Sequence, residues 1–175
     1  MSDQPTPERE AYETSARPRR AVVVCASTRA ATGVYTDHTG PVIVEALRQW
    51  GFDVSDATVV ADGEPFREAL RAAVHLQPQV LLTTGGTGIS PTDSTPEVTT
   101  QVLDRQVPGI AEALRAVGVA KGVPTAMLSR GVAGIAGRTL VVNLPGSAGA
   151  VRDALDLLAD VLPHAVDQIS GGDHR

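Results

Sequence analysis

One segment of the chain combines glycines, hydroxyl side chains and an acid in a pattern that suits phosphate chemistry. Residues Thr83–Glu97 join a short apolar run to a stretch with helical spacing, and they include Gly85, Gly86 and Gly88. A strand that ends in glycines and continues as a helix leaves backbone N–H groups free to bind phosphate, aided by the helix dipole. Asp93 is the one carboxylate in this turn. An acid beside phosphate-binding amides indicates a bridging cation, and hence metal-assisted phosphate chemistry.

This glycine-rich segment matches neither of the common nucleotide-binding motifs. A Walker loop has Lys after its last glycine, where this chain has Ile89. The dinucleotide fingerprint also fails, because position 91 is a proline instead of a glycine. The alternative interpretation is a turn that only lets a strand and a helix pack closely.

The composition favours one α/β domain. The chain has 175 residues, of which 42% are hydrophobic and only 3% aromatic, so its core is expected to consist of aliphatic side chains. The net charge of −5 and the lack of basic clusters argue against nucleic-acid binding. No run approaches the roughly 18 apolar residues that span a membrane. The lone Cys25 permits no internal disulfide, which fits a cytoplasmic protein.

Apolar runs alternate with helical stripes along the chain. This alternation predicts a three-layer, doubly wound and mostly parallel sheet, with helices on both faces and a small β-hairpin at Gly137-Arg138. We expect a disordered tail over residues 1–20 and a domain over 21–172. Thr95 is expected to cap a helix whose first turn holds Pro96. The expected strands are 21–26, 54–60, 80–83 and 139–144, and a long helix over 151–162 is expected to be followed by a separate short one over 163–170.

The polar segments that follow the predicted strands are expected to meet. In open parallel sheets, ligands bind outside the carboxyl ends of the strands. Four segments are placed there by the predicted order of elements, namely residues 27–40, 61–64, 83–93 and 143–149. They carry several acids, hydroxyl groups and most of the loop glycines. The sequence therefore predicts a single ligand site at one edge of the sheet.

Several motifs resemble those of a known family. They are Thr83–Gly88 with Asp93, Thr95–Glu97, Leu128–Arg130 and Asn143–Gly146, within a likeness that runs from about residue 22 to 172. In this order and spacing they resemble the molybdopterin-binding proteins of molybdenum-cofactor synthesis, above all the Mog-like molybdopterin adenylyltransferases. The resemblance implies transfer of AMP from ATP to the terminal phosphate of molybdopterin, with Mg²⁺, and release of pyrophosphate. It also implies a homotrimer, and a separate molybdate-inserting protein as a partner.

The resemblance assigns roles to individual residues. Asp62 and Asp93 match the essential acids of the family, and both are expected to hold Mg²⁺. From its residue type alone, Asp62 also suits a turn or helix cap, and Arg130 suits either a phosphate contact through its planar fork or a surface ion pair. Which loop takes the pterin and which the adenine stays open. The expected binding residues are Ser27, Asp37, Gly40, Thr84, Gly85, Gly86, Thr87, Gly88, Ser129, Arg130, Asn143, Pro145, Gly146 and Ser147.

The chain also departs from the family pattern. Thr92 stands where many relatives have Arg, and Thr28-Arg29 stands where an acid is common. Ala148 replaces a frequent proline after the second glycine turn. These changes affect expected ligand contacts more than the fold. They keep a second hypothesis open, in which the chain is a non-catalytic paralogue that binds molybdopterin or another protein.

Overall fold

The computed structural model describes residues 19–171, and residues 1–18 and 172–175 lie outside the described part. The expected disordered tail falls almost wholly in the first of these segments, so it stays a prediction. The first strand begins one residue earlier than expected, at Arg20. Arg19 precedes that strand and pairs with Asp167 near the end of the chain, with Nη2 2.7 Å from Oδ1.

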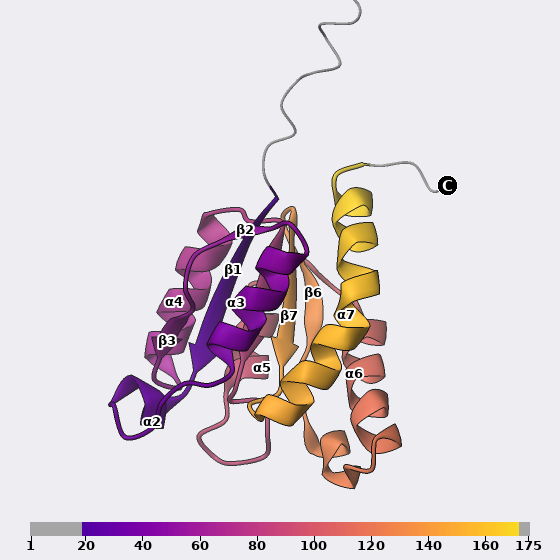
Figure 1. Ribbon diagram of the computed structural model, residues 1–175. Coiled ribbons are helices and arrows are strands. Elements are labelled where there is room, and N and C mark those ends of the chain that lie inside the picture. Colours follow the sequence, from indigo (N-terminus) through magenta and orange to yellow (C-terminus); the bar gives the residue numbers. More distant parts are fainter. Residues whose placement is uncertain (1–18, 172–175) are drawn as a thin grey trace, which may run out of the picture.

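A seven-stranded mixed sheet forms the centre of the molecule (Figure 1). The strands run in the order β2-β1-β4-β7-β6-β5, and β3 pairs with β1 as well. All pairs from β2 to β7 are parallel, whereas β6 runs antiparallel to both β7 and β5. Their bounds are β1 (Arg20–Ala26), β2 (Asp53–Val54), β3 (Thr58–Val60), β4 (Val80–Thr84), β5 (Arg105–Gln106), β6 (Ala133–Ala136) and β7 (Thr139–Leu144). The expected doubly wound, mostly parallel sheet with a small hairpin is confirmed.

The second predicted strand is divided into two. β2 pairs with the start of β1 and β3 with its end, as Arg20 lies opposite Asp53 and Val24 opposite Thr58. The register shifts by one residue between these pairs. Three residues, 55–57, lie opposite only two residues of β1, 22 and 23, and they do not pair with it. The interruption resembles a β-bulge, in which one strand has an extra residue.

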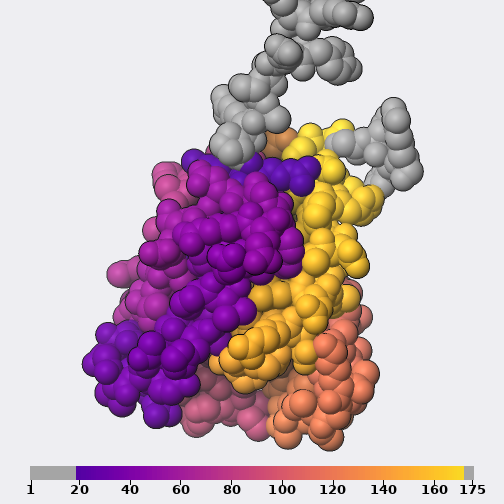
Figure 2. Space-filling view, in the orientation of Figure 1, coloured from indigo at the N-terminus to yellow at the C-terminus, as the bar shows by residue number. Residues whose placement is uncertain are grey.

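Helices cover both faces of the sheet. α3 (Gly40–Gln49) and α7 (Ala148–Ile169) pack side by side on one face, as Figure 2 shows, and α6 (Pro108–Ala120) packs beside α7. α4 (Glu64–His75) and α5 (Thr95–Thr100) cover the opposite face. The short α2 (Thr28–Ala31) follows β1, and a 3₁₀ turn, η1 (Pro124–Leu128), packs against α6.

Two apolar cores lie on either side of the sheet. The first holds Leu47 of α3 and Leu158 of α7, and the second holds Phe66 and Leu70 of α4; all four are fully buried. Successive side chains of a strand point to opposite faces. Those of the central strands β1, β4 and β7 therefore enter the two cores in turn.

Two local predictions are wrong. The separate helix over 163–170 is instead part of α7, which contains Pro163 in its interior. Leu162 and Val166 are buried on the same stripe as the preceding turns. Their packing therefore offsets the hydrogen bond that a proline removes. Thr95 does not cap α5, because Ser94 occupies the cap position and Thr95 is already helical.

Candidate functional site

The loops after the parallel strands meet at one edge of the sheet, as the sequence predicted. The N–H of Ser27, after β1, donates to the Val60 carbonyl at the end of β3 (2.9 Å). The Thr84 hydroxyl, at the end of β4, donates to the Pro145 carbonyl after β7 (2.7 Å). These bonds join the end of β1 to that of β3 and the end of β4 to that of β7, and the ladder pair of Cys25 with Thr84 places the ends of β1 and β4 side by side.

The two glycine turns touch each other. Gly85 has a φ of +88°, and a Cβ atom there would lie 2.2 Å from the Ala26 carbonyl oxygen. A Cβ on Gly146 would lie 3.3 Å from the Gly85 Cα. Only glycine permits this approach at Gly85, whereas a Cβ on Gly146 would require the neighbouring turn to move by a few tenths of an ångström. At Gly85, close packing therefore requires glycine whether or not a ligand binds.

The two candidate acids flank the first glycine turn. Asp62 accepts hydrogen bonds at Oδ2 from the backbone N–H and the hydroxyl of Thr28, at 3.1 and 2.7 Å. Its Oδ1 faces Gly86, 3.0 Å from where a Cβ would lie on that glycine. Asp93 approaches the other end of the turn, with Oδ2 2.8 Å from the corresponding point on Gly88. Both carboxylates therefore border the same few backbone amides.

The arrangement of these acids fits a magnesium ion shared with phosphates. Among residues 19–171 no group of three or more His, Cys, Asp or Glu side chains could hold a metal alone. Mg²⁺ commonly uses only one or two carboxylates and takes its other ligands from water and substrate phosphates. Asp62 and Asp93 each have one oxygen that accepts no hydrogen bond within the described residues. Those oxygens are the protein ligands available for such an ion.

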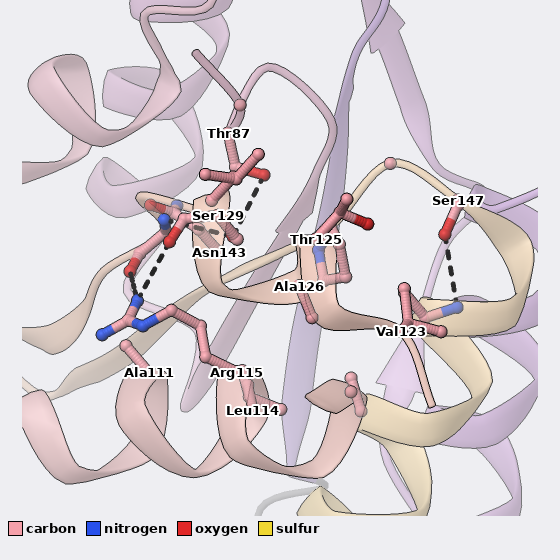
Figure 3. Close-up of a pocket in the computed structure, with 18 of the residues that line it drawn as sticks. Thr87, Ala111, Leu114, Arg115, Val123, Thr125, Ala126, Ser129, Asn143 and Ser147 are labelled. Carbon is pink, nitrogen blue, oxygen red and sulfur yellow. Dashed lines mark hydrogen bonds between the residues drawn. The ribbon is translucent and has the colours of Figure 1, made fainter. Parts of the chain in front are cut away.

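A cavity of about 620 Å³ lies beside the glycine turns, between α6, η1 and the start of α7. Figure 3 shows Thr87, Ser129 and Ser147 around it, with Leu114 and Ala126 on its apolar side. Its size is typical of pockets for small molecules. The expected site residues in its lining are Gly86, Thr87, Gly88, Asp93, Ser129, Asn143, Pro145, Gly146 and Ser147.

Arg115 of α6 belongs to the same cavity and was missed from the sequence. Its Nη1 donates to the carbonyls of Ser129 and Gly131, at 3.3 and 3.1 Å, and thereby fixes the segment before β6 (Figure 3). Arg115 also lines the cavity as a cation. A signal was present in the chain: Ala111, Arg115 and Gly118 have the spacing of one helix face, on which two small residues leave room beside an arginine.

The remaining expected residues of the first-strand loop lie outside the cavity lining. The Ser27 hydroxyl caps α2 by accepting from the Ala30 N–H (3.2 Å). Asp37 accepts from the backbone N–H groups of Thr39 and Gly40 at the start of α3. Gly40 is a packing position, because a Cβ would lie 2.3 Å from Asp37 Oδ2.

The hydrogen bonds of Asp37 to the start of α3, together with burial, determine the pKa values of Asp37 and Cys25. Burial would raise the pKa of Asp37, but hydrogen bonds from Gly40 and Thr39 outweigh it and lower the pKa below its ordinary value. Burial, followed by the nearby Asp37 carboxylate, raises the pKa of Cys25 well above its usual range. Cys25 is therefore a neutral, buried thiol, as the sequence indicated.

Asn143 lines the cavity, but its side chain is used within the protein. Its Nδ2 donates to the hydroxyls of Thr83 and Thr99, both at 2.9 Å, and its Oδ1 accepts from the Val132 N–H at 3.1 Å. The residue is 3% exposed. Its side-chain amide thus joins β7, β4, α5 and the start of β6, and its backbone N–H donates to the Val132 carbonyl at 2.9 Å, so Asn143 supports the cavity wall.

Arg130 lies outside the lining of the main cavity. Its guanidinium contacts the backbone of the first glycine turn and the carboxylate of Glu97. The ion pair is therefore present. The expected phosphate contact stays a prediction, and the donors of the fork are directed to protein groups.

A mostly parallel sheet of this order, two touching glycine turns and an adjoining cavity define the class of protein. The chain belongs to the family described as the probable molybdopterin binding domain, whose family model matches residues 22–164. No helix in the described part of the chain is long and apolar enough to cross a membrane.

Individual relatives narrow this class. The chain is 37% identical over 153 residues to a molybdopterin adenylyltransferase of Helicobacter pylori, covering 85% of this chain and 86% of that one. It is 37% identical over 159 residues to a molybdenum cofactor biosynthesis bifunctional protein of Chlorobaculum tepidum, covering 90% of this chain and 50% of that one. The solved structure of the molybdopterin biosynthesis Mog protein from Mycobacterium ulcerans is 60% identical, with a TM-score of 0.82 over 86% of this chain and 99% of that one.

Proposed function

We propose that this protein transfers AMP from ATP to the terminal phosphate of molybdopterin. A phosphate oxygen of molybdopterin attacks the α-phosphorus of ATP, the bond to the bridging oxygen breaks, and pyrophosphate leaves. The observation that carries the proposal is the glycine turn Gly85–Gly88, bordered by Asp62 and Asp93 and open to the 620 Å³ cavity. The name of the Helicobacter pylori relative, a molybdopterin adenylyltransferase, supports the same reaction.

The two sides of this turn suit different parts of the substrates. The cavity has mostly apolar walls from α6, η1 and α7, which suit a flat pterin ring, and the two glycine turns at its end offer amides to a phosphate. Gly86 lines the cavity, whereas Asp62, which borders Gly86, does not. We therefore assign the pterin to the cavity and the nucleotide phosphates to the Asp62 side.

The protein contributes positioning and charge to this reaction. Two polyanions must approach each other, so backbone amides near the reacting phosphates offset their repulsion. Bound Mg²⁺ supplies neutralisation of phosphate charge. Asp62 and Asp93 would hold it, through the oxygens that Thr28 and Ser90 leave free. In this proposal the protein forms no covalent bond to either substrate.

Incubation with molybdopterin, ATP and Mg²⁺, followed by detection of adenylylated molybdopterin and pyrophosphate, tests this function. We expect Asp62→Asn and Asp93→Asn each to lower turnover by about 100-fold or more, because each removes a charge near the reacting phosphates. The control is Asp56→Asn, since Asp56 is 96% exposed and pairs only with Arg48 within the described residues. Turnover by both site variants at the rate of the unmodified protein would contradict the mechanism.

A second candidate function is a non-catalytic molybdopterin-binding paralogue. Two observations favour it: Thr92 stands where many relatives have an arginine, and Arg130 is engaged with protein groups. Retained molybdopterin affinity without ATP-dependent release of pyrophosphate would identify this function.

We also propose the assembly and partner that the resemblance implies. These are a homotrimer and a molybdate-inserting protein that takes the adenylylated product. Sedimentation equilibrium of the full chain tests the first. Transfer of the product to a purified molybdate-inserting protein tests the second.

A further inference from the structure

The exposed turn that carries Asp93 is held at both ends by a single side chain from another part of the chain. The Nε of Arg130 donates to the Gly88 carbonyl at 2.7 Å, and its Nη2 donates to the Asp93 carbonyl at 2.8 Å. The backbone N–H of Arg130 donates to the Thr87 carbonyl at 2.8 Å. These three bonds join the segment before β6 to the whole span 87–93.

The third arm of the guanidinium ends on an acid. Its Nη1 pairs with Glu97 in the first turn of α5. The backbone N–H of Glu97 and the neighbouring Arg130 lower the pKa of this carboxyl below its ordinary value, which favours its charged form. Glu97 lies four residues beyond Asp93, in the helix that follows the turn 87–93. The ion pair therefore fixes the direction of the fork, and the fork fixes the turn.

The other hydrogen bonds of the turn are few. Ser90 and Asp93 bond each other, with the Ser90 N–H 3.1 Å from Asp93 Oδ2 and the Asp93 N–H 3.0 Å from the Ser90 carbonyl. The hydroxyls of Ser90 and Thr92 lie 3.2 Å apart, and the Ser129 hydroxyl donates to that of Thr87 at 3.5 Å. Ile89 at its tip is 68% exposed. A turn with this exposure and so few contacts would move readily without an external anchor.

We propose that Arg130 is a positioning residue, which holds the turn 87–93 so that Asp93 and the loop amides face the bound phosphates. The direct phosphate contact expected from the sequence would have only the two remaining N–H groups of the guanidinium to use, because each of its three nitrogens already donates to the turn or to Glu97. The catalytic consequence rests on the proposed function, whereas the anchoring of the turn does not. The motifs Ser129-Arg130 and Thr95-Pro96-Glu97 thus form one unit through the ion pair between them.

Lysine cannot replace arginine at this position. A guanidinium presents its donors in a rigid plane and reaches the Gly88 and Asp93 carbonyls and Glu97 together, whereas an ammonium is a single point of charge. Arg130→Lys therefore retains the charge and loses most of the anchor. Glu97→Gln removes the ion pair but leaves the carbonyl bonds, so its effects should be in the same direction and smaller.

Hydrogen exchange of the ligand-free protein tests the anchor independently of activity. In Arg130→Lys, we expect the amides of Ser90 and Asp93 to exchange about tenfold faster, the change that follows from losing roughly one net hydrogen bond. The control is Arg48→Lys, because Arg48 also donates to a carbonyl and a carboxylate, Val54 and Asp56, but lies on α3. Exchange that is unchanged in Arg130→Lys would overturn the proposal.

Kinetics then separate positioning from direct binding. We expect kcat of Arg130→Lys to fall by roughly 10- to 100-fold, and the Mg²⁺ concentration for half-maximal rate to rise, because the Asp93 carboxylate is misplaced. The KM for ATP should change by less than about threefold, since the nucleotide keeps its own contacts. A large rise in KM with unchanged exchange would identify a direct phosphate ligand and overturn the proposal. Should the unmodified protein form no product, the proposed function fails, and hydrogen exchange still decides the anchor.

If Arg130→Lys does not fold, Glu97→Gln provides the same test. Faster exchange at Ser90 and Asp93 in that variant supports the anchor, and exchange equal to that of the unmodified protein counts against it. The Arg48→Lys control should match the unmodified protein in both exchange and turnover.

Discussion

At the residue scale, the polar side chains around the site divide into two groups. Asn143 and Arg115 donate to protein groups and fix the backbone that surrounds the cavity. Asp62 and Asp93 border the glycine turn, and each retains one oxygen without a hydrogen bond in the described structure. Polar residues that suggest ligand binding in a sequence can therefore either support the backbone or remain available to a ligand. Their burial and their hydrogen-bond partners in the structure distinguish these two roles.

Asn143→Ala tests the scaffold role of that amide. Its three hydrogen bonds lie in a buried region, and their removal leaves the Val132 N–H without its side-chain acceptor. We expect the free energy of unfolding to fall by about 2–4 kcal/mol, since lost hydrogen bonds and unpaired buried groups both contribute. Urea denaturation measures the change. The matched control is Gln49→Ala, whose amide pairs only with Glu45 on the surface in the described structure and should cost less than about 0.5 kcal/mol. Equal costs for the two variants would assign Asn143 no structural role.

At the element scale, the glycine turns bring strand ends together more closely than any other residue allows. Gly85 combines a positive φ with a backbone oxygen directly in the path of a Cβ. Gly137, in the hairpin between β6 and β7, has a φ of +59° but no atom within 4 Å of such a Cβ. A Cβ added at Gly137 would strain only the backbone, whereas one added at Gly85 would also clash with a neighbouring strand. Comparing the two positions therefore separates the free-energy cost of the backbone conformation from that of close packing.

Gly85→Ala and Gly137→Ala make this comparison measurable. At Gly137 the added methyl strains only the backbone, which should cost about 1 kcal/mol. At Gly85 the methyl also displaces the Ala26 carbonyl, so we expect a loss at least about 2 kcal/mol greater. Thermal and urea unfolding of both variants report the difference. A smaller loss for Gly85→Ala would mean that the strand ends separate easily, and the touching turns would then not be a rigid part of the site.

Elements with local signals could be predicted from the sequence, whereas those set by distant partners could not. The run 21–26 and the glycines after Thr84 mark their own strand and turn, and the structure confirms both. The two-residue β5 carries no periodicity and exists only because it pairs with β6. α7 continues through Pro163 because residues on both sides of the proline pack in the core, which the local proline signal does not reveal.

The candidate site shows the same limit. The glycine turns and the acids beside them were visible as motifs, and their convergence follows from strand direction. The partners of Asn143 lie 44 and 60 residues away, so its internal role depended on the fold. The backbone partners of Arg130 are 42 and 37 residues away, so the sequence indicated only a phosphate contact or a surface ion pair and gave no sign of these carbonyl bonds.

At the scale of the whole molecule, the sheet connects the two cores. Leu81 and Leu82 are neighbours in β4, yet Leu81 lies in the core with α4 and Leu82 in the core with α3 and α7. Both side chains are fully buried. Loss of either core would expose one of them in the central strands, so the two cores are expected to unfold together. The site lies at the edge of these same strands and depends on both cores.

Leu70→Ala and Leu158→Ala test this cooperativity from opposite faces of the sheet. Each side chain is fully buried, in the α4 core and the α7 core respectively, and each truncation should lower the free energy of unfolding by about 2–5 kcal/mol. Because the sheet separates the two positions, the double variant should show the sum of the two losses within roughly 0.5 kcal/mol.

Two spectroscopic signals test whether the cores unfold together. Circular dichroism reports on the whole fold, and tryptophan fluorescence reports on Trp50 beside the first core. Within each variant that remains folded, the two signals should give the same urea midpoint. The control is Leu76→Ala, since that side chain is 58% exposed and should cost little. Separate midpoints for the two signals in Leu70→Ala would show that one core survives without the other, and the sheet would then not act as a single cooperative support for the site.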